Sequence, residues 1–222
     1  MTTEIKFLAT PEKGEVSAIL DRPDNAKALL VLGHGSGTNM RHALISNLSL
    51  ALVEQSVATF RYQYPYSEKG GGGLDGRKVL LATVNAAILS ANDNCTDLPI
   101  FAGGHSMSGR MITLAEAESP LPISGIVCFA FPINGGKGPT ERAEHFPNIS
   151  KPMLFHQGTK DKLADIEVIN RVVDSMKNRA RIHIIETADH GYKVLKRSGT
   201  SHEEVIQKMA KVTSEWMDEV LR

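Results

Sequence analysis

Cysteine is scarce in this chain, with only Cys95 and Cys128 among 222 residues. The two are not spaced like metal ligands, and residues 1–16 lack the basic and apolar stretches of a secretory signal. We therefore expect neither a metal site nor a disulfide, and we expect Cys128, which lies in the apolar run 125–131, to be a small buried side chain. No apolar run has the length of a membrane span. The sequence thus predicts a cytoplasmic protein without a membrane partner.

The chain also has no excess of positively or negatively charged residues. Lys and Arg together number 25, as do Asp and Glu, so the formal net charge is zero. Balanced charge does not favour nucleic acid or an anionic membrane, and we expect neither as a partner. Hydrophobic residues make up 41% of the chain, which is ordinary for a folded protein. The length and composition predict one domain over residues 1–222 with a well-buried core.

Strand-like and helix-like segments alternate along most of the sequence. Strand character is found in residues 4–8, 15–20, 28–32, 57–62, 99–102, 126–131, 153–156 and 181–186. Helical patterns are found in residues 42–55, 80–88, 107–117 and 166–176, and in a last segment that begins at Ser201 with Glu204 in a capping-box position. The first two strands suggest a hairpin. The alternation that follows predicts an α/β fold with a mainly parallel sheet and helices on both faces.

The segment Gly104-His105-Ser106-Met107-Ser108-Gly109 follows a predicted strand and precedes a predicted helix. A tight turn in that position presents a serine as a nucleophile, and it requires small residues two positions to either side. Gly104 and Ser108 occupy those positions. The alternative is an ordinary glycine-rich turn in which Ser106 caps the helix. We predict Ser106 as the nucleophile.

A serine hydroxyl needs a base that accepts its proton and an acid that orients the base. On such a turn the acid and then the base follow the serine in chain order, at the ends of later strands. Asp161 and His190 have these positions and are the predicted acid and base. Asp165, expected on the next helix, is the alternative acid, and Asp189 is disfavoured because adjacent residues rarely face each other. Three other histidines near strand ends are expected to be structural: His34, His105 and His156.

The tetrahedral intermediate of acyl transfer needs two hydrogen-bond donors for its oxyanion. The backbone N–H of Met107, next to the nucleophile, is the first candidate. The second is the N–H of Gly35 or Ser36 in the loop after the strand 28–32, where glycines allow a close approach to substrate. The alternative for this loop, a phosphate-binding turn, is disfavoured because no Lys-Ser/Thr pair follows it.

Two arginines are secondary candidates for binding a substrate carboxylate. Arg61 lies at the end of a predicted strand and Arg110 in the first turn after Ser106. For either one, pairing with a structural acid is the alternative, because arginine in such elements usually anchors a loop.

The connection 134–150 is polar, contains Gly135, Gly136 and Gly138, and lacks an apolar helical stripe. Such a segment does not enclose a long acyl chain, because burial of each CH₂ requires that water be excluded. We expect an open site without a large lid and small, short-acyl substrates. The glycine run 70–73 is expected to be a mobile loop and is the alternative source of a cover.

Together these motifs resemble the α/β-hydrolase superfamily, in its branch related to dienelactone hydrolases, and within that branch the KANL3/Tex30-like hydrolases. The resemblance covers residues 28–190 and rests on the stretches 32–40, 60–66, 103–110, 131–132, 157–161 and 188–190. It implies the α/β-hydrolase fold and a triad of Ser106, Asp161 and His190. The chain departs from the pattern at Ser108, where glycine is usual, and at His105, where a basic residue is common. Dienelactone hydrolases proper are less similar, since they carry cysteine at the position of Ser106.

Two functions remain open at this stage. The first is a carboxylesterase-like serine hydrolase (EC 3.1 class) that acts on a small ester or thioester through an acyl-enzyme and needs no cofactor or metal. The second is a catalytically idle hydrolase fold that serves as a protein-interaction module, as some eukaryotic relatives do. The chain combines the tight turn at Ser106 (the nucleophile elbow), the loop with Gly35 and Ser36 (the oxyanion loop) and the expected order of Ser106, Asp161 and His190. The presence of all three features favours the enzyme. A haloalkane dehalogenase would need Asp at position 106, whereas peptidase and depolymerase activities share the fold and stay open.

Overall fold

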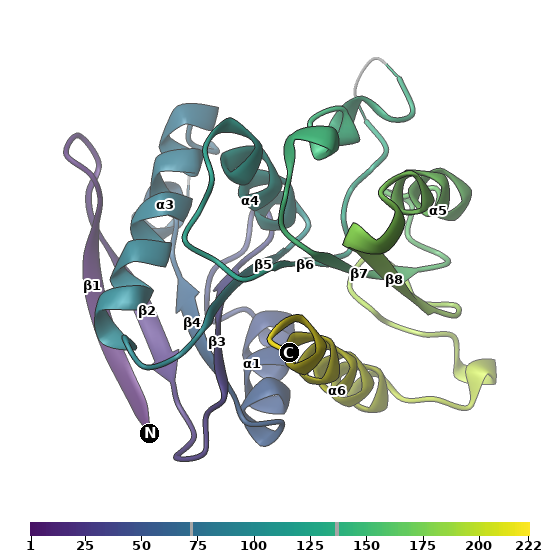
Figure 1. Ribbon diagram of the computed structural model, residues 1–222, viewed down its shortest axis with the longest axis horizontal. Helices are drawn as coiled ribbons and strands as arrows, with labels where there is room; N and C mark the ends of the chain where they lie inside the picture. Colours follow the sequence, from purple (N-terminus) through teal and green to yellow (C-terminus); the bar gives the residue numbers. More distant parts are fainter. Residues whose placement is uncertain (72, 136–137) are drawn as a thin grey trace.

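A computed structural model describes residues 1–71, 73–135 and 138–222 (Figure 1). One sheet contains the strands β1 Thr2–Thr10, β2 Gly14–Asp21, β3 Ala28–Gly33, β4 Val57–Tyr62, β5 Ile100–His105, β6 Ile126–Phe129, β7 Met153–Gly158 and β8 Ala180–Ile185. The α-helices are α1 Ala43–Glu54, α2 Pro65–Glu68, α3 Arg77–Asn94, α4 Met107–Glu118, α5 Ile166–Ser175 and α6 His202–Val220.

The strands follow the order β1-β2-β4-β3-β5-β6-β7-β8 across the sheet. β1 and β2 form an antiparallel hairpin, and β2 is also antiparallel to β4. From β4 to β8 every neighbouring pair is parallel. The carboxyl ends of β3, β5, β7 and β8 therefore lie along one edge, which is where ligands bind in open α/β sheets.

Helices cover both faces of the sheet. α1 and α6 lie together on one face, and α3, α4 and α5 lie on the other (Figure 1). Apolar side chains fill the space between each helical layer and the sheet; for example, the Trp216 ring of α6 meets Phe101 of β5 edge to face at a centroid distance of 5.6 Å. The capping box at Ser201 and Glu204 is present. The predicted α/β architecture with a mainly parallel sheet is confirmed.

Strand β5 runs further than the sequence pattern indicates. Its apolar run ends at Ala102, and glycine at 103 and 104 disfavours a strand. The structure continues β5 to His105, because the parallel neighbours β3 and β6 pair with its backbone there. The strand therefore ends directly before Ser106. Both cysteines are buried free thiols, as expected.

The connection from β6 to β7 carries short 3₁₀ turns, Glu141–Ala143 and Phe146–Asn148, where a lid-bearing enzyme would carry inserted helices. Gly136 in this connection and Gly72 of the glycine run lie outside the described residues, so the mobile loop at 70–73 stays a prediction. Across the described ranges, no helix combines the length and the apolar character that crossing a membrane requires.

Candidate active site

Ser106 stands at the junction of β5 and α4 in an unusual backbone conformation. Its φ is 53° and its ψ is −110°, which is strained for a residue with a Cβ. The turn is stabilised by a 2.8 Å hydrogen bond from the Ser106 N–H to the Phe129 carbonyl of β6. It is tight enough that a Cβ on Gly104 would overlap the Ser108 side chain. The sequence requirement for small residues around Ser106 thus has a direct steric cause.

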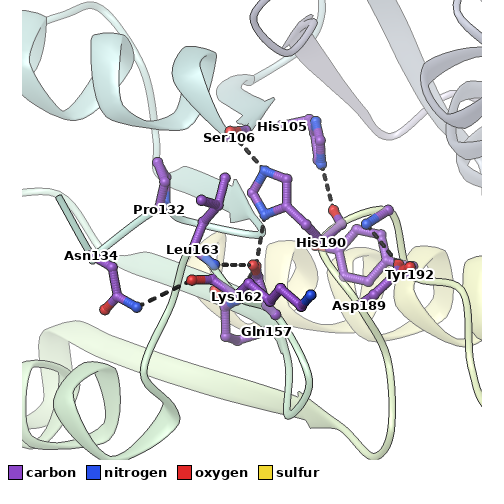
Figure 2. Close-up of polar contacts among 12 residues, drawn as sticks. His105, Ser106, Pro132, Asn134, Gln157, Lys162, Leu163, Asp189, His190 and Tyr192 are labelled. Atoms are coloured by element: carbon purple, nitrogen blue, oxygen red, sulfur yellow. Dashed lines mark hydrogen bonds and ion pairs between the residues drawn. The ribbon is translucent and has the colours of Figure 1, made fainter.

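The structure brings Ser106, His190 and Asp161 into one hydrogen-bonded line. Figure 2 shows the His190 ring turned toward Ser106. Ser106 Oγ lies 2.9 Å from His190 Nε2, and His190 Nδ1 lies 2.7 Å from Asp161 Oδ2. An ionised carboxylate only accepts hydrogen bonds, so Nδ1 carries the proton and Nε2 is left to accept the serine proton. This is the geometry of a nucleophile paired with an oriented base.

Asp161 is held on both of its carboxylate oxygens. Oδ2 also accepts a hydrogen bond from Gln157 Nε2 at 2.7 Å, and Oδ1 accepts one from the Leu163 N–H at 2.8 Å. Its side chain has no exposed surface, whereas that of His190 is 26% exposed. Asp161 is therefore a rigid acceptor beneath a base that reaches the surface.

The two alternative acids are engaged elsewhere. Asp165 caps α5 and accepts the backbone N–H groups of Glu167 and Val168. The Asp189 carboxylate accepts those of Gly191 and Lys193 at 2.9 Å each. Of the three candidates, the structure brings Asp161 to His190.

Direct contacts between loops position the base. Gly158 ends β7 so close to Ala188 that a Cβ would overlap the Ala188 carbonyl, and the Lys160 N–H donates to that carbonyl at 2.9 Å. His105 Nε2 lies 2.8 Å from the carbonyl oxygen of His190 and donates to it (Figure 2). Desolvation lowers the pKa of His105 to about 4, so its ring is neutral near pH 7. His105, the residue before Ser106, thus anchors the loop that carries His190.

The loop after β3 carries Gly35 and Ser36, the two candidates for the second oxyanion donor. Met107 is the first residue of α4, where backbone N–H groups have no partner inside the helix. Ser36 lines the same cavity as Ser106 and Met107, whereas Gly35 packs against the His105 ring. Ser36 is thus the candidate that lines the cavity, and which of the two N–H groups acts with that of Met107 stays a prediction.

Ser108, which stands where glycine is usual, joins this loop to the elbow. Its Oγ donates to the His34 carbonyl at 2.5 Å and accepts from the Tyr64 hydroxyl at 3.0 Å. The Tyr62 and Tyr64 hydroxyls are 3.0 Å apart. Burial raises the pKa of Tyr64 to about 12, so this chain of hydroxyls stays neutral. A glycine at 108 would remove the acceptor of the buried Tyr64 hydroxyl and the donor to the His34 carbonyl.

Arg61 is not part of the site. It is 8% exposed, and its guanidinium contacts the Asp21 carboxylate at 2.6 Å, Ser46 Oγ at 3.0 Å and the Met40 carbonyl at 3.2 Å. The expectation that Arg61 binds substrate is therefore wrong, and the alternative of a structural pair holds. The reason is that the antiparallel β2–β4 pairing places Asp21 opposite Thr59, two positions from Arg61, so the two side chains lie on the same face of the sheet.

Arg110 does lie in the site. A cavity of about 450 Å³ opens beside Ser106, within the range of small-molecule sites. It is lined by Ser36, Leu74, Ser106, Met107, Arg110, Met111, Pro132, Asn134, Gly135, Arg142 and Leu163. Arg142 and Gln157 are neighbours of the site that sequence reasoning missed, since neither stands in a motif position with a known role. The described residues include no group of three His, Cys, Asp or Glu side chains arranged to hold a metal.

Comparisons with known proteins agree with this architecture. A family model described as "Alpha/beta hydrolase domain" matches residues 26–218. A putative alpha/beta hydrolase of unknown function from Agrobacterium tumefaciens has a TM-score of 0.76 at 15% identity, covering 99% of this chain and 96% of its own. A serine hydrolase without lid from Xanthomonas campestris has a TM-score of 0.74 at 14% identity, and the match covers 97% of this chain and 94% of the Xanthomonas protein. Dienelactone hydrolase from Anabaena variabilis has a TM-score of 0.74 at 19% identity, covering 98% of each chain. At these identities the similarity shows a shared fold.

Proposed function

The chain belongs to the α/β-hydrolase domain family, and we propose that it is a serine hydrolase that cleaves an ester or thioester through an acyl-enzyme intermediate. The observation that carries this proposal is the 2.9 Å hydrogen bond between Ser106 Oγ and His190 Nε2, continued to Asp161 at 2.7 Å. A fold without catalytic use has no need of that alignment beside an open cavity.

In the proposed mechanism, His190 Nε2 takes the proton of Ser106 as Oγ attacks the substrate carbonyl carbon. Asp161 keeps the His190 ring in the required tautomer and stabilises the imidazolium that forms. The N–H groups of Met107 and Ser36 hydrogen-bond the oxyanion. When the intermediate collapses, His190 donates its proton to the departing alkoxide or thiolate. Water then repeats the sequence on the acyl-serine and releases the acid.

We also propose small, short-acyl substrates. The cavity of about 450 Å³ is bordered by Leu74 and Leu163, which are 51% and 44% exposed, so water reaches the rim. A long acyl chain would not be removed from water there. The KANL3/Tex30-like assignment within the family rests on the motif stretches around Gly35, Ser106 and His190. A reducing, cytoplasmic location is supported by the buried free thiols of Cys95 and Cys128.

The test is labelling by a fluorophosphonate together with turnover of p-nitrophenyl esters from acetate to palmitate. We expect stoichiometric labelling of the wild type, none of Ser106→Ala, and a maximum of kcat/KM at a short ester. Labelling of Ser106→Ala would place the nucleophile elsewhere. A wild type that neither labels nor turns over any ester would support an interaction module, and a maximum at decanoate or longer would contradict the short-acyl assignment.

A further inference from the structure

Two guanidinium groups line the cavity that holds Ser106. Arg110 lies four residues after the nucleophile on α4, and Arg142 belongs to the 3₁₀ turn Glu141–Ala143 in the connection after β6. They come from different elements and both face the cavity. The proposed acyl transfer, which uses Ser106, His190, Asp161 and two backbone N–H groups, assigns no role to either.

The contacts of the two arginines indicate that they are held for a ligand. Arg142 Nη1 donates to the Pro132 carbonyl at 2.9 Å, which fixes its guanidinium at the cavity wall. In the described part of the chain, Arg110 Nε is buried and has no hydrogen-bond partner. Arg61 Nε is in the same state inside a structural ion pair, so the unpartnered Nε does not by itself indicate a ligand. What distinguishes Arg110 is that it lines the cavity while no acidic side chain of the described residues forms an ion pair with it, so its charge is available to an anionic ligand.

The charges around the pair define the ligand further. Burial lowers the pKa of Arg110, and the positive charges of Arg142 and Arg77 lower it further, while the negative charge of Glu141 acts in the opposite direction. Arg77 is paired with Glu118 at 2.5 Å. Two positive guanidinium groups at one cavity wall suit an anionic ligand.

Apart from Ser36, Ser106 and Asn134, the remainder of the cavity wall is apolar or glycine. Met107, Met111 and Pro132 lie inside, and Leu74 and Leu163 border the opening. A ligand that fits has an apolar body and one anionic end.

We propose that Arg110 and Arg142 form a carboxylate-binding subsite and that the substrates are esters or thioesters that carry a second, free carboxylate. This inference rests on the proposed hydrolase function and names its substrate class. The guanidinium fork matches a carboxylate in shape and binds it in a bidentate manner. Binding of the carboxylate fixes the distance from the anionic end to the carbonyl carbon that Ser106 attacks.

The experiment compares kcat/KM within matched pairs of esters, each value divided by the hydroxide-catalysed rate of the same ester. One pair, 4-acetoxybenzoate and its methyl ester, places the charge on the leaving group. The other, monophenyl adipate and phenyl hexanoate, places it on the acyl group. We expect the wild type to prefer the anion by about 10-fold or more in at least one pair, as a charge-assisted hydrogen bond provides.

Arg110→Gln and Arg142→Gln should each reduce this anion-to-neutral ratio toward one, mainly through KM for the anion. Because the ratio is taken within one variant, partial unfolding cancels. Arg77→Gln removes the same charge from a residue paired outside the cavity, and its ratio should stay within about twofold of wild type, since exposed charges are screened by solvent and salt.

A wild-type ratio near one in both pairs, or a ratio unchanged in both arginine variants, would overturn the subsite. Preference for 4-acetoxyphenyl phosphate over 4-acetoxybenzoate would overturn the carboxylate assignment. Failure of the hydrolase proposal is distinguishable: Ser106 then does not label with fluorophosphonate and neutral esters are not turned over. If Ser106 is labelled and neutral esters are turned over, but the anionic esters are not preferred, the carboxylate-binding subsite is contradicted and the hydrolase proposal stands.

Discussion

The molecule contains two charged hydrogen-bond networks that differ in where they end. The relay of hydrogen bonds from Asp161 through His190 to Ser106 begins in the protein interior and ends at the cavity. The Asp21 network, built around the Asp21–Arg61 pair, lies between β2, β4 and α1, and the two side chains are 10% and 9% exposed.

The Asp21–Arg61 pair is surrounded by protein groups: the hydroxyls of Thr2, Ser46 and Ser49 and the Met40 carbonyl bind it, and among the described residues only Arg61 Nε of the pair is buried without a partner. The relay instead leaves its serine facing a space that a substrate can enter. A network closed on itself contributes to stability, whereas one that ends at a cavity is available for chemistry. Substitutions in the two networks should therefore separate loss of activity from loss of stability.

The largest effect is expected from Ser106→Ala. Without the nucleophile, kcat should fall by about 10⁶-fold, to the residual rate that binding and the oxyanion donors provide. The free energy of unfolding should stay near that of the wild type, because the 2.8 Å bond from residue 106 N–H to Phe129 involves only backbone. Steady-state kinetics with calorimetry measure both. A large fall in Tm would contradict the separation of the two networks.

Asp161→Asn should reduce kcat by about 10⁴-fold, because the amide no longer enforces the tautomer of His190 that accepts the serine proton. The matched control is Asp165→Asn, the same chemical change four residues on, at the N-cap of α5. It should leave kcat within a few-fold of wild type, since Asn is as good an N-cap as Asp. Full activity in Asp161→Asn with loss in Asp165→Asn would transfer the acid role to Asp165.

Asp21→Asn should have the opposite effect: it should reduce stability and leave activity unchanged. It leaves the Arg61 charge buried without its partner and should cost about 3–5 kcal/mol of stability. Activity per folded molecule, measured well below Tm, should be retained. A loss of kcat without a change in Tm would show that the Asp21 network serves the chemistry.

The Asp21 effect has a defined pH dependence. Burial alone would raise the pKa of Asp21, but hydrogen bonds from Thr2 and Arg61 and the Arg61 charge lower it below its ordinary value of 3.8. A carboxyl with a lowered pKa contributes stability above its unfolded pKa and loses it as pH falls through the folded value. The difference in Tm between wild type and Asp21→Asn should therefore persist at neutral pH and shrink below about pH 4.

The smallest effect is expected where the elbow meets the oxyanion loop. Ser108→Ala removes the donor to the His34 carbonyl and the acceptor of Tyr64, and should cost about 1–3 kcal/mol. The loop with Ser36 should loosen and kcat should fall a few-fold. In a double-mutant cycle with Tyr64→Phe, the two losses should be less than additive, because both remove the same contact. Strict additivity would contradict the hydroxyl chain.

Several features of the site follow from local sequence. The small residues around Ser106 reflect a turn that admits nothing larger beside it, and the chain order of Asp161 and His190 follows from the parallel sheet, whose strand ends share one edge. The capping box at Ser201 is likewise a local contact. These features depend on neighbours a few residues apart or on strand order, and both can be read from the pattern.

Other features depended on residues far apart in the chain. Arg61 lies near the end of β4 and Arg110 lies in the first turn of α4, and the sequence offers the same two roles for both. In the structure, Arg61 pairs with Asp21, 40 residues away, whereas Arg110 faces a cavity that Arg142 also lines. That Ser36 lines the cavity, while the His105 ring occupies the space beside Gly35, also depends on how the loop after β3 packs against β5. The sequence by itself determined the α/β architecture and the three residues of the relay, because periodicity and chain order are properties of the chain. Only the tertiary structure decided which charges are paired and which remain for a ligand, because a long side chain finds its partner in three dimensions.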